Sequence, residues 1–459
     1  MLKNFGVRHI YKYSIILSAA TLILLSLVLL IAYLAYPVTP TAKARPTFSP
    51  YPDGKNFAFS ITDDADSHQT EKLKPVYDLL TRLGIKSTIA VWSLDPVQED
   101  NKTDIVAMSG MEQHFEGDSL QNTAYREFVV SLIENGHEIG MHTVSGGSDL
   151  RETTIRGYEE FKSIIGSYPN INIMHSNNLE NIYWGSNVFT NPAGHWFFKN
   201  IIGTVYSKAQ LPFGGEDQDS PYFWGDIVKE KTKYVRMWGT SEINTLAFNP
   251  NMPYHDPSKP YVNYWFSFSD GFMLRYFNDL ISDENIQKLV EQRGASIVYT
   301  HFAGGFAKKD SSGIYKVDTR FQNQMEKLSK QKDPWFVTTS TLLDRLLLMK
   351  KISIADTKEA IYVLNSNESS VRGFTLLTKP LINLYSKDDK IYTANNEGEI
   401  IIDEISAGES IVLRKSADTI IVNHKFPEKN RQHNNQIGFL ENANLILGRI
   451  LILLFSHSG

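Results

Sequence analysis

The stretch Phe57-Ala-Phe-Ser-Ile-Thr-Asp-Asp-Ala-Asp66 decides how this chain folds. Residues 57–61 predict a short buried strand, which stops at Thr62 and is followed by two adjacent carboxylates, Asp63 and Asp64. Two like charges a few ångströms apart repel each other, and a divalent cation that binds one of them removes this cost. The other carboxylate is then free to act as a base. The alternative is a solvated turn, since an Asp-Asp pair also suits turns and helix caps.

Length and composition narrow the classes of protein to consider. The chain has 459 residues, which is more than one compact domain usually holds, and its 42% hydrophobic and 21% charged residues are typical of a globular protein. A net charge of −5 without a long basic run argues against nucleic acid as a partner. The sequence has no cysteine, so a metal site would have to use Asp, Glu, His or Asn.

The N-terminal region predicts a membrane anchor. Residues 14–36 carry no charge over 23 positions, which is long enough for one transmembrane helix. Three basic residues precede the span and two follow it, so the positive-inside rule favours, by a narrow margin, a cytoplasmic segment 1–13. Residues 37–52 contain five prolines and are typical of an extended linker. We expect a single-pass membrane protein whose folded body is extracytoplasmic.

A repeated pattern organises residues 53–352. An apolar helical stripe is followed by a glycine, then by a short strand, then by a polar residue, and three such strands deliver His142, His175 and His301. Alternating helices and strands predict a parallel sheet, and right-handed crossovers place the carboxyl ends of its strands on one rim. The two aspartates and the three histidines are therefore expected to converge, although they lie far apart in the sequence.

The segment 176–283 is rich in Trp, Tyr, Asn and Gly. Such residues suit a sugar-binding groove, and they suit equally a barrel wall packed with aromatic side chains. Asn178 and Trp184 follow His175 closely and are candidates for substrate binding. Arg236 lies on an alternating strand and is a third candidate.

The pattern changes near residue 353. Short alternating strands separated by turn residues predict a small β-sandwich over residues 353–425, with a role in sugar binding or in packing. Residues 426–459 form a tail that contains an apolar run broken by Arg449, and no function is assigned to it.

Three segments, in this order, resemble motifs of the polysaccharide deacetylases, the NodB-homology or carbohydrate esterase 4-like superfamily. They are Thr62-Asp63-Asp64, Gly136-His-Glu-Ile-Gly-Met-His142-Thr143 and Ile297-Val-Tyr-Thr-His301. The resemblance covers roughly residues 55 to 350. It is closest to a divergent, membrane-anchored branch of the superfamily, the WbmS-like branch, which implies a location in the bacterial cell envelope.

The resemblance implies a fold and a set of roles. The fold is α/β, a distorted (β/α)7 barrel of NodB type, here with a C-terminal β-sandwich and an N-terminal transmembrane helix. The implied cofactor is a divalent metal, zinc in many members. By this resemblance Asp63 is the base, Asp64 a metal ligand, His142 a second ligand and His301 the general acid.

These roles fit the chemistry of removing an acyl group from a sugar. A bound metal lowers the pKa of a water molecule and polarises the carbonyl group. A carboxylate then takes a proton from the water, and an imidazole gives one to the leaving amine. Asp63 and His301 come from distant strands, as two groups on opposite sides of the scissile bond require.

The sequence departs from the family at two points. The family has a second histidine four residues after the first, and here that position is Gly146. Its Arg-x-Pro-Tyr motif is not recognisable either. We therefore expect His175 to complete the metal site and Arg236 to do the work of the missing arginine.

The sequence thus predicts a metal-dependent hydrolase that removes N-acyl or O-acyl groups from a cell-surface polysaccharide. One alternative is a catalytically degenerate barrel that binds polysaccharide or an assembly partner, in which the histidines are structural. Another is a glycoside hydrolase, which would pair two carboxylates across a sugar, although no second acid at a strand end supports it.

Overall fold

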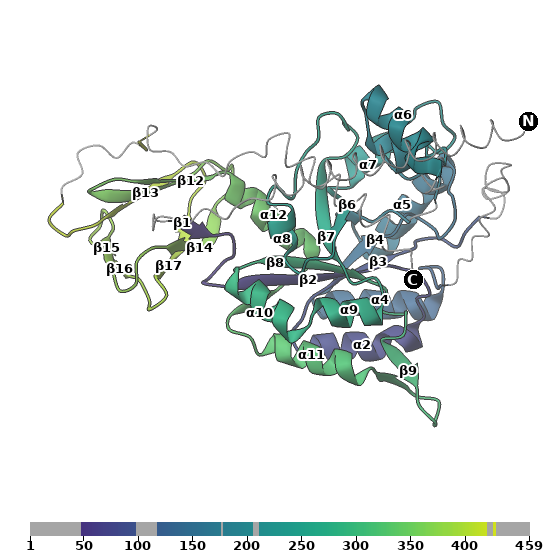
Figure 1. The fold of residues 1–459 in the computed structure, drawn as a ribbon, viewed down its shortest axis with the longest axis horizontal. Helices are drawn as coiled ribbons and strands as arrows, with labels where there is room; N and C mark the ends of the chain where they lie inside the picture. Colours follow the sequence, from purple (N-terminus) through teal and green to yellow (C-terminus); the bar gives the residue numbers. More distant parts are fainter. Residues whose placement is uncertain (1–46, 98–116, 176–177, 205–210, 420–425, 428–459) are drawn as a thin grey trace, which may run out of the picture.

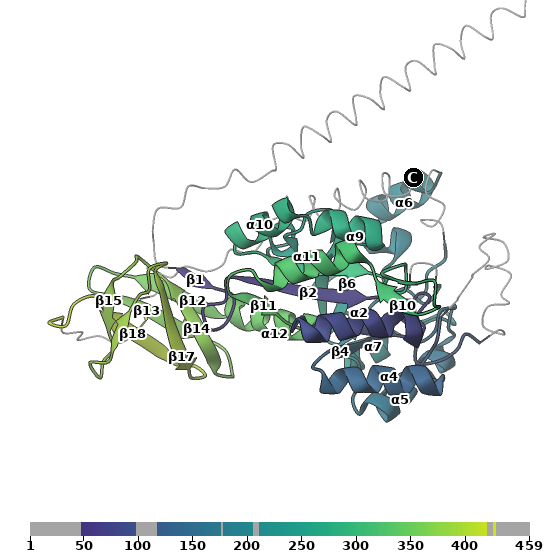
Figure 2. The same cartoon turned by 90° about the horizontal axis from the view of Figure 1, so that it is seen from below.

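The computed structural model describes residues 47–97, 117–175, 178–204, 211–419 and 426–427. Within these ranges the chain forms two parts, a barrel of strands covered by helices and a smaller all-β region, which lie side by side (Figure 1). Helix α12 (Thr339–Lys350) leads from the barrel to the β region (Figure 2).

Seven parallel strands form a closed barrel. Each strand pairs with the next along the chain, and pairing of the last strand with the first closes the ring. A further short strand, β11 (Pro334–Phe336), adds in parallel to the first half of the first strand. The barrel strands are β2 (Phe57–Asp63), β3 (Thr88–Val91), β4 (Glu138–Met141), β5 (Ile171–Asn172), β6 (Tyr234–Thr240), β7 (Tyr264–Asp270) and β8 (Ala295–Thr300). This confirms the parallel barrel predicted from the sequence.

The side chains of β2 alternate between the outer helical layer and the barrel interior. Phe57, Phe59 and Ile61 belong to the large hydrophobic cluster under the helices. Ala58 belongs to a second cluster with the inner faces of other strands and with helix α12. Continued along the strand, this alternation sends Asp63 outward and Asp64 inward.

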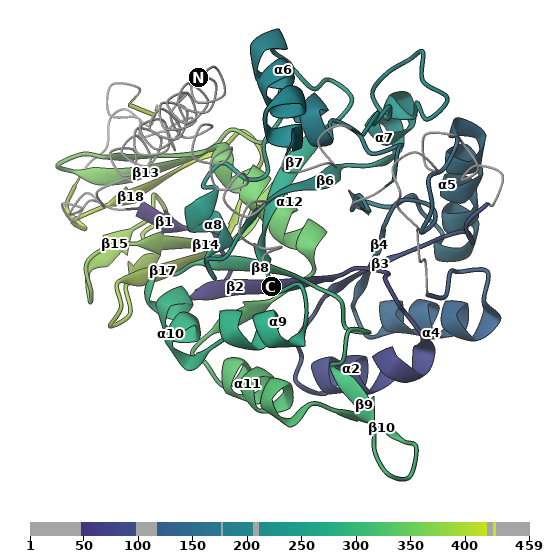
Figure 3. The same ribbon diagram turned by 45° about the vertical axis from the view of Figure 1, so that its right-hand side comes forward.

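Helices pack on the outside of the barrel (Figure 3). Two 3-10 turns, η1 (Gly185–Val188) and η2 (Ile202–Thr204), and a hairpin, β9 (Ala307–Lys309) with β10 (Tyr315–Val317), lie between the regular units. The helices are α2 (Thr70–Arg82), α4 (Thr123–Glu134), α5 (Arg151–Ile165), α6 (Pro192–Asn200), α7 (Gly225–Lys231), α8 (Thr245–Phe248), α9 (Leu274–Leu280), α10 (Asp283–Glu291) and α11 (Thr319–Ser329).

The start of helix α12 packs against the inner side of the barrel. Leu342, Leu343 and Leu346 share a cluster with inward-facing strand residues, and the Ser60 and Thr339 hydroxyls lie 2.9 Å apart. Small residues such as Ala58 leave room for the helix. The amino ends of the strands are therefore packed, and the chemistry is left to the carboxyl ends.

The β region contains two antiparallel sheets that share one hydrophobic cluster. One sheet holds β1 (Thr47–Ser49), β14 (Val371–Leu377) and β17 (Glu399–Ile405). The other holds β12 (Ile352–Asp356), β13 (Ala360–Asn365), β18 (Ser410–Arg414), β15 (Asn383–Tyr385) and β16 (Ile391–Thr393). Residues 47–49 of the expected linker thus form an edge strand.

Buried polar contacts join the two parts. The guanidinium group of Arg345, on helix α12, donates hydrogen bonds to the carbonyl oxygens of Pro50, Arg372 and Gly373. The relative position of the barrel and the β region is therefore fixed by specific bonds as well as by apolar packing.

None of the helices in the described ranges is both long and apolar enough to span a bilayer. The predicted membrane segment, residues 14–36, lies outside the described residues, as does most of the tail from residue 426.

Candidate metal centre

The expected histidines do meet at the carboxyl rim of the barrel. His142 directly follows β4, His175 follows β5 after two residues, and His301 directly follows β8. The group that they surround is Asp66, three residues beyond the end of β2. Because all these strands are parallel, their carboxyl ends bring residues from four separate parts of the sequence to one place.

Asp66 is the centre of this cluster. Its Oδ2 atom lies 3.1 Å from His142 Nε2 and 3.2 Å from His301 Nε2, and its Oδ1 atom lies 3.2 Å from His175 Nε2. The Asp66 side chain is 37% exposed, whereas His142 and His175 are buried. The cluster is therefore exposed to solvent at Asp66 and is not sealed inside the core.

Asp66, His142 and His175 can hold a metal ion. One ligand atom from each residue lies within 4.8 Å of the others, and in the described part of the chain this is the set of acids and histidines with that property. One carboxylate and two imidazoles form a donor set that suits catalytic zinc. His175 thus lies next to His142, although metal binding by His175 itself stays a prediction.

The outer nitrogens of these imidazoles are fixed by acceptors. His142 Nδ1 lies 2.9 Å from the carbonyl oxygen of Ile173, and His175 Nδ1 lies 2.8 Å from Asn178 Oδ1. Since these oxygens only accept, each Nδ1 carries the proton. In the neutral ring each Nε2 then presents a lone pair to the cluster, as a metal ligand must.

Mutual attraction shifts the pKa values inside the cluster. Burial acts to raise the pKa of Asp66, but hydrogen bonds from His142, His175 and His301 outweigh it and hold that pKa well below its usual value. Burial acts to lower the pKa of His301, and its interaction with Asp66 outweighs this and raises the pKa to about 9. The pKa of His175 is raised for the same reason. The cluster is thus a strongly coupled group of charges.

Asp64 has a different partner. Arg236 Nη1 lies 2.8 Å from Asp64 Oδ1 and its Nη2 lies 2.5 Å from Oδ2, so the guanidinium group holds both carboxylate oxygens. The Arg236 guanidinium also lies 4.3 Å from the ring centroid of Tyr299. Asp64 Oδ2 is 3.9 Å from His142 Nε2. Asp64 therefore borders the cluster, and Arg236 fixes the orientation of the Asp64 carboxylate.

Asp63 lies on the other side of the barrel wall. It is fully buried, its Oδ1 accepts from the Phe302 backbone N–H at 2.7 Å, and its Oδ2 accepts from the Tyr77 hydroxyl at 2.9 Å. His68 Nε2 lies 3.3 Å from the same Oδ2. The expected base thus faces the helical layer, because it is the outward residue of an alternating strand, and it does not border the Asp66 cluster.

The three expected substrate-binding residues have different surroundings. Asn178 is fully buried and its amide nitrogen points to four oxygens, those of Thr143, Ser145, Gly147 and Glu180. Arg236 is also buried, and Trp184 is half-buried at the start of η1. Substrate contact by Trp184 stays a prediction.

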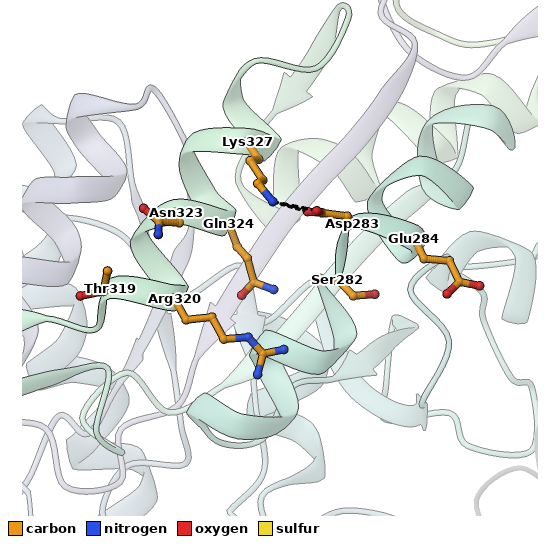
Figure 4. A pocket seen from close by; sticks show the side chains of 8 residues that line it. All are labelled: Ser282, Asp283, Glu284, Thr319, Arg320, Asn323, Gln324 and Lys327. Carbon is orange, nitrogen blue, oxygen red and sulfur yellow. Dashed lines mark hydrogen bonds and ion pairs between the residues drawn. The ribbon is translucent and has the colours of Figure 1, made fainter.

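A surface cavity of about 740 Å³ lies elsewhere, between the start of helix α10 and helix α11 (Figure 4). Its charged side chains include Lys327, which pairs with Asp283 at 2.7 Å. None of the cluster residues lines it. The cavity is therefore not a part of the candidate metal centre.

Comparison with known proteins gives low similarities. No family model matches the chain, and no curated protein matches it. Among solved structures, a protein from Mycobacterium smegmatis assigned to the polysaccharide deacetylases is 13% identical, with a TM-score of 0.36 over 67% of this chain and 96% of that one. A mutant of the Bacillus subtilis peptidoglycan deacetylase PdaC is 11% identical, with a TM-score of 0.30 over 64% and 93%.

A further similar structure is a mutant of a CE4 family pseudoenzyme with restored enzymatic activity. It is 11% identical, with a TM-score of 0.26 over 65% of this chain and 72% of that one. These neighbours are of the class that the sequence motifs resemble. Any activity of this chain has to be argued from its own residues.

Sequence reasoning did not single out Asp66. The residue stands in the stretch 57–66, two positions after Asp64. This short distance from Asp64 was the signal in the sequence that Asp66 could join the site. The strand ends at Asp63, so the direction of the Asp66 side chain depends on the turn that follows and not on strand alternation.

Proposed function

We propose that this protein is a metal-dependent hydrolase that removes acyl groups from a polysaccharide. The observation that carries the proposal is the convergence of Asp66, His142 and His175, with the Asp64–Arg236 pair on one border and His301 on another. Acyl hydrolysis needs a set of metal ligands, a carboxylate base and an imidazole acid, and all three are found together at the carboxyl ends of the strands.

Asp66, His142 and His175 would hold the metal, which we expect to be zinc. When bound, zinc supplies Lewis-acid polarisation of the acyl carbonyl and lowers the pKa of a water molecule. This ligand set differs from the one expected by family resemblance, since Asp66 takes the place given to Asp64.

Asp64 is the base in this proposal. A carboxylate oxygen has two lone pairs, so Asp64 can accept from Arg236 and still take a proton from the attacking water. Asp63 is fully buried, and both its oxygens accept hydrogen bonds in the wall of the barrel. The role of base therefore moves from Asp63 to its neighbour, and Asp63 holds the segment that follows His301.

His301 is the general acid. Its Nδ1 lies 2.9 Å from the carbonyl oxygen of Phe272, which accepts the Nδ1 proton and fixes the ring, and its Nε2 faces the cluster. Protonated at Nε2, it can give that proton to the leaving amine or alcohol. Water attacks the carbonyl carbon and gives a proton to Asp64. The bond between the acyl carbon and the sugar nitrogen or oxygen breaks, and the leaving group takes the proton from His301.

The substrate class and location follow from the same proposal. We infer an N-acylated or O-acylated polysaccharide of the bacterial cell envelope, reached by a barrel that residues 14–36 anchor in the membrane with the folded body outside the cytoplasm. The motif resemblance and the uncharged segment support this location.

Metal content and acetate release test the proposal together. Full-length protein in detergent would be measured for bound metal by mass spectrometry, then assayed for acetate release from N-acetylglucosamine oligomers and from acetylated xylan. We expect about one zinc per chain, and turnover that a chelator abolishes and zinc restores. Protein that holds zinc but releases no acetate would favour the degenerate, polysaccharide-binding barrel. Protein without metal affinity would defeat the proposal.

A further inference from the structure

Tyr299 lies beside the proposed acid but has no part in the mechanism so far. It is on β8, two residues before His301, and its strand position is paired with Thr62 on β2. Residues two apart on a strand share one face, so Tyr299 and His301 both face the barrel interior. Tyr299 therefore lies on the same face of β8 as the general acid, two residues further from the carboxyl end of the strand.

The ring of Tyr299 is held in place on several sides. The Arg236 guanidinium lies 4.3 Å from its centroid, and the Phe268 ring packs edge-on at 5.3 Å. The Phe272 ring lies 6.2 Å away on another side. These contacts use the faces and edges of the ring and leave its hydroxyl group on the side of His301.

The hydroxyl of Tyr299 has one weak protein contact. Its oxygen lies 3.5 Å from His301 Nε2, and among the described residues it makes no other hydrogen bond. The residue is only half-buried, so a ligand can reach it. Burial, and then the charge of Asp64, raise the pKa of Tyr299 well above its usual value, so the group keeps its proton. It is a neutral donor without a strong acceptor.

We propose that the Tyr299 hydroxyl donates a hydrogen bond to the acyl oxygen of the substrate while negative charge develops on it. The inference rests on the proposed hydrolysis. Tyr299 keeps its proton throughout, whereas His301 loses one to the leaving group and Asp64 gains one from water. A positioned donor at this oxygen stabilises the transition state more than the ground state.

Tyr299→Phe tests the donor, because it keeps the ring under Arg236 and removes only the hydroxyl. We expect kcat for acetate release to fall by roughly 10²- to 10³-fold, as for the loss of one oxyanion donor, with zinc content unchanged. Tyr276→Phe is the matched control, since Tyr276 is 48% exposed on helix α9, and it should retain wild-type activity.

A second substrate separates a direct contact from an effect through His301. p-Nitrophenyl acetate has a leaving group that needs no proton, so His301→Asn should lose little activity on it. A direct donor is still needed there, and Tyr299→Phe should remain slow. Loss confined to the sugar substrate would overturn the inference, and so would activity equal to that of Tyr276→Phe. A zinc-loaded wild type that releases no acetate from either substrate would overturn both this inference and the proposed function.

Discussion

The rim of the barrel and the β region differ in the kind of residue that they bury. At the rim, buried positions hold Asp64, Arg236, His142, His175 and His301. In the β region the shared cluster is apolar, with Ile354, Val363, Phe374, Ile402 and Leu413 among its members. Burying charge costs free energy unless it is paired, whereas burying apolar surface stabilises the fold.

This difference indicates where function and stability lie. The charged rim residues are paired with one another, so they can stay ionised although they are buried. The apolar cluster of the β region contributes to the stability of the fold. Variants at the rim should therefore lose metal or activity, and variants in the β cluster should lose stability while each folded molecule stays active.

The strongest test at the rim is Asp66→Asn. The amide is a poor ligand for zinc, so we expect loss of stoichiometric metal and a fall in acetate release of at least about 10³-fold, in the range of losses seen when central catalytic groups are removed. Metal analysis and the turnover assay measure both. Asp226→Asn is the control, because Asp226 forms a 2.7 Å pair with Arg151 on the surface. A fully metallated, active Asp66→Asn protein would refute the proposed ligand set.

The matching test in the β region is Phe374→Ala. Phe374 is fully buried and lies 5.6 Å, centroid to centroid, from Phe48 of β1. We expect the free energy of unfolding to fall by about 3–5 kcal/mol, measured by urea denaturation, with unchanged turnover per folded molecule. Ile401→Ala, at a 45% exposed position on β17, should change the stability little. Loss of turnover in folded Phe374→Ala would show that the two regions are not separate in function.

A third test concerns His137, which lies in the same segment as His142 but outside the Asp66 cluster. His137 is buried in the wall, where its Nδ1 accepts from the Ser87 backbone N–H at 3.2 Å. Burial, followed by the charge of Lys86, lowers the pKa of His137 from 6.5 to about 4. The folded state thus favours the neutral ring, and the stability from this group is complete above pH 6.5 and is lost as the pH falls toward 4.

The loss should reach up to about 3 kcal/mol, since each pKa unit corresponds to about 1.4 kcal/mol. Denaturation curves from pH 8 to 4 measure it. His137→Asn keeps an acceptor for Ser87 and cannot titrate, so its stability should depend less on pH over this window. Identical pH dependence in the two proteins would show that His137 is not the titrating group.

The barrel could be predicted because its signals are local and repeated. Helical stripes, glycine stops and short strands recur before His142, His175 and His301, and parallel pairing forces their convergence. The roles of the aspartates could not be read in the same way. Alternation along β2 sends Asp63 outward and Asp64 inward, but its direction depends on which face meets the helices.

Asp66 could not be placed because it lies in a turn beyond the strand. Asn178 was expected at a groove, since its spacing from His175 gives no sign that its side chain turns back under the imidazole. Strand-end positions follow from sequence periodicity, and side-chain partners in the loops do not.

The smallest expected effect lies one layer beneath the rim, at Asn178. Its Oδ1 accepts the Nδ1 proton of His175, so Asn178→Ala should free the ring and weaken zinc binding by roughly 10- to 100-fold, as losses beneath a metal ligand typically do. Asn178→Asp keeps that acceptor but places a carboxylate beside Glu180 and the Gly147 carbonyl. It should hold zinc almost as the wild type does and lose stability instead. Competition with a chelator measures the affinity. If Asn178→Ala instead raised KM for the sugar substrate with zinc affinity unchanged, Asn178 would contact the substrate and would not position His175.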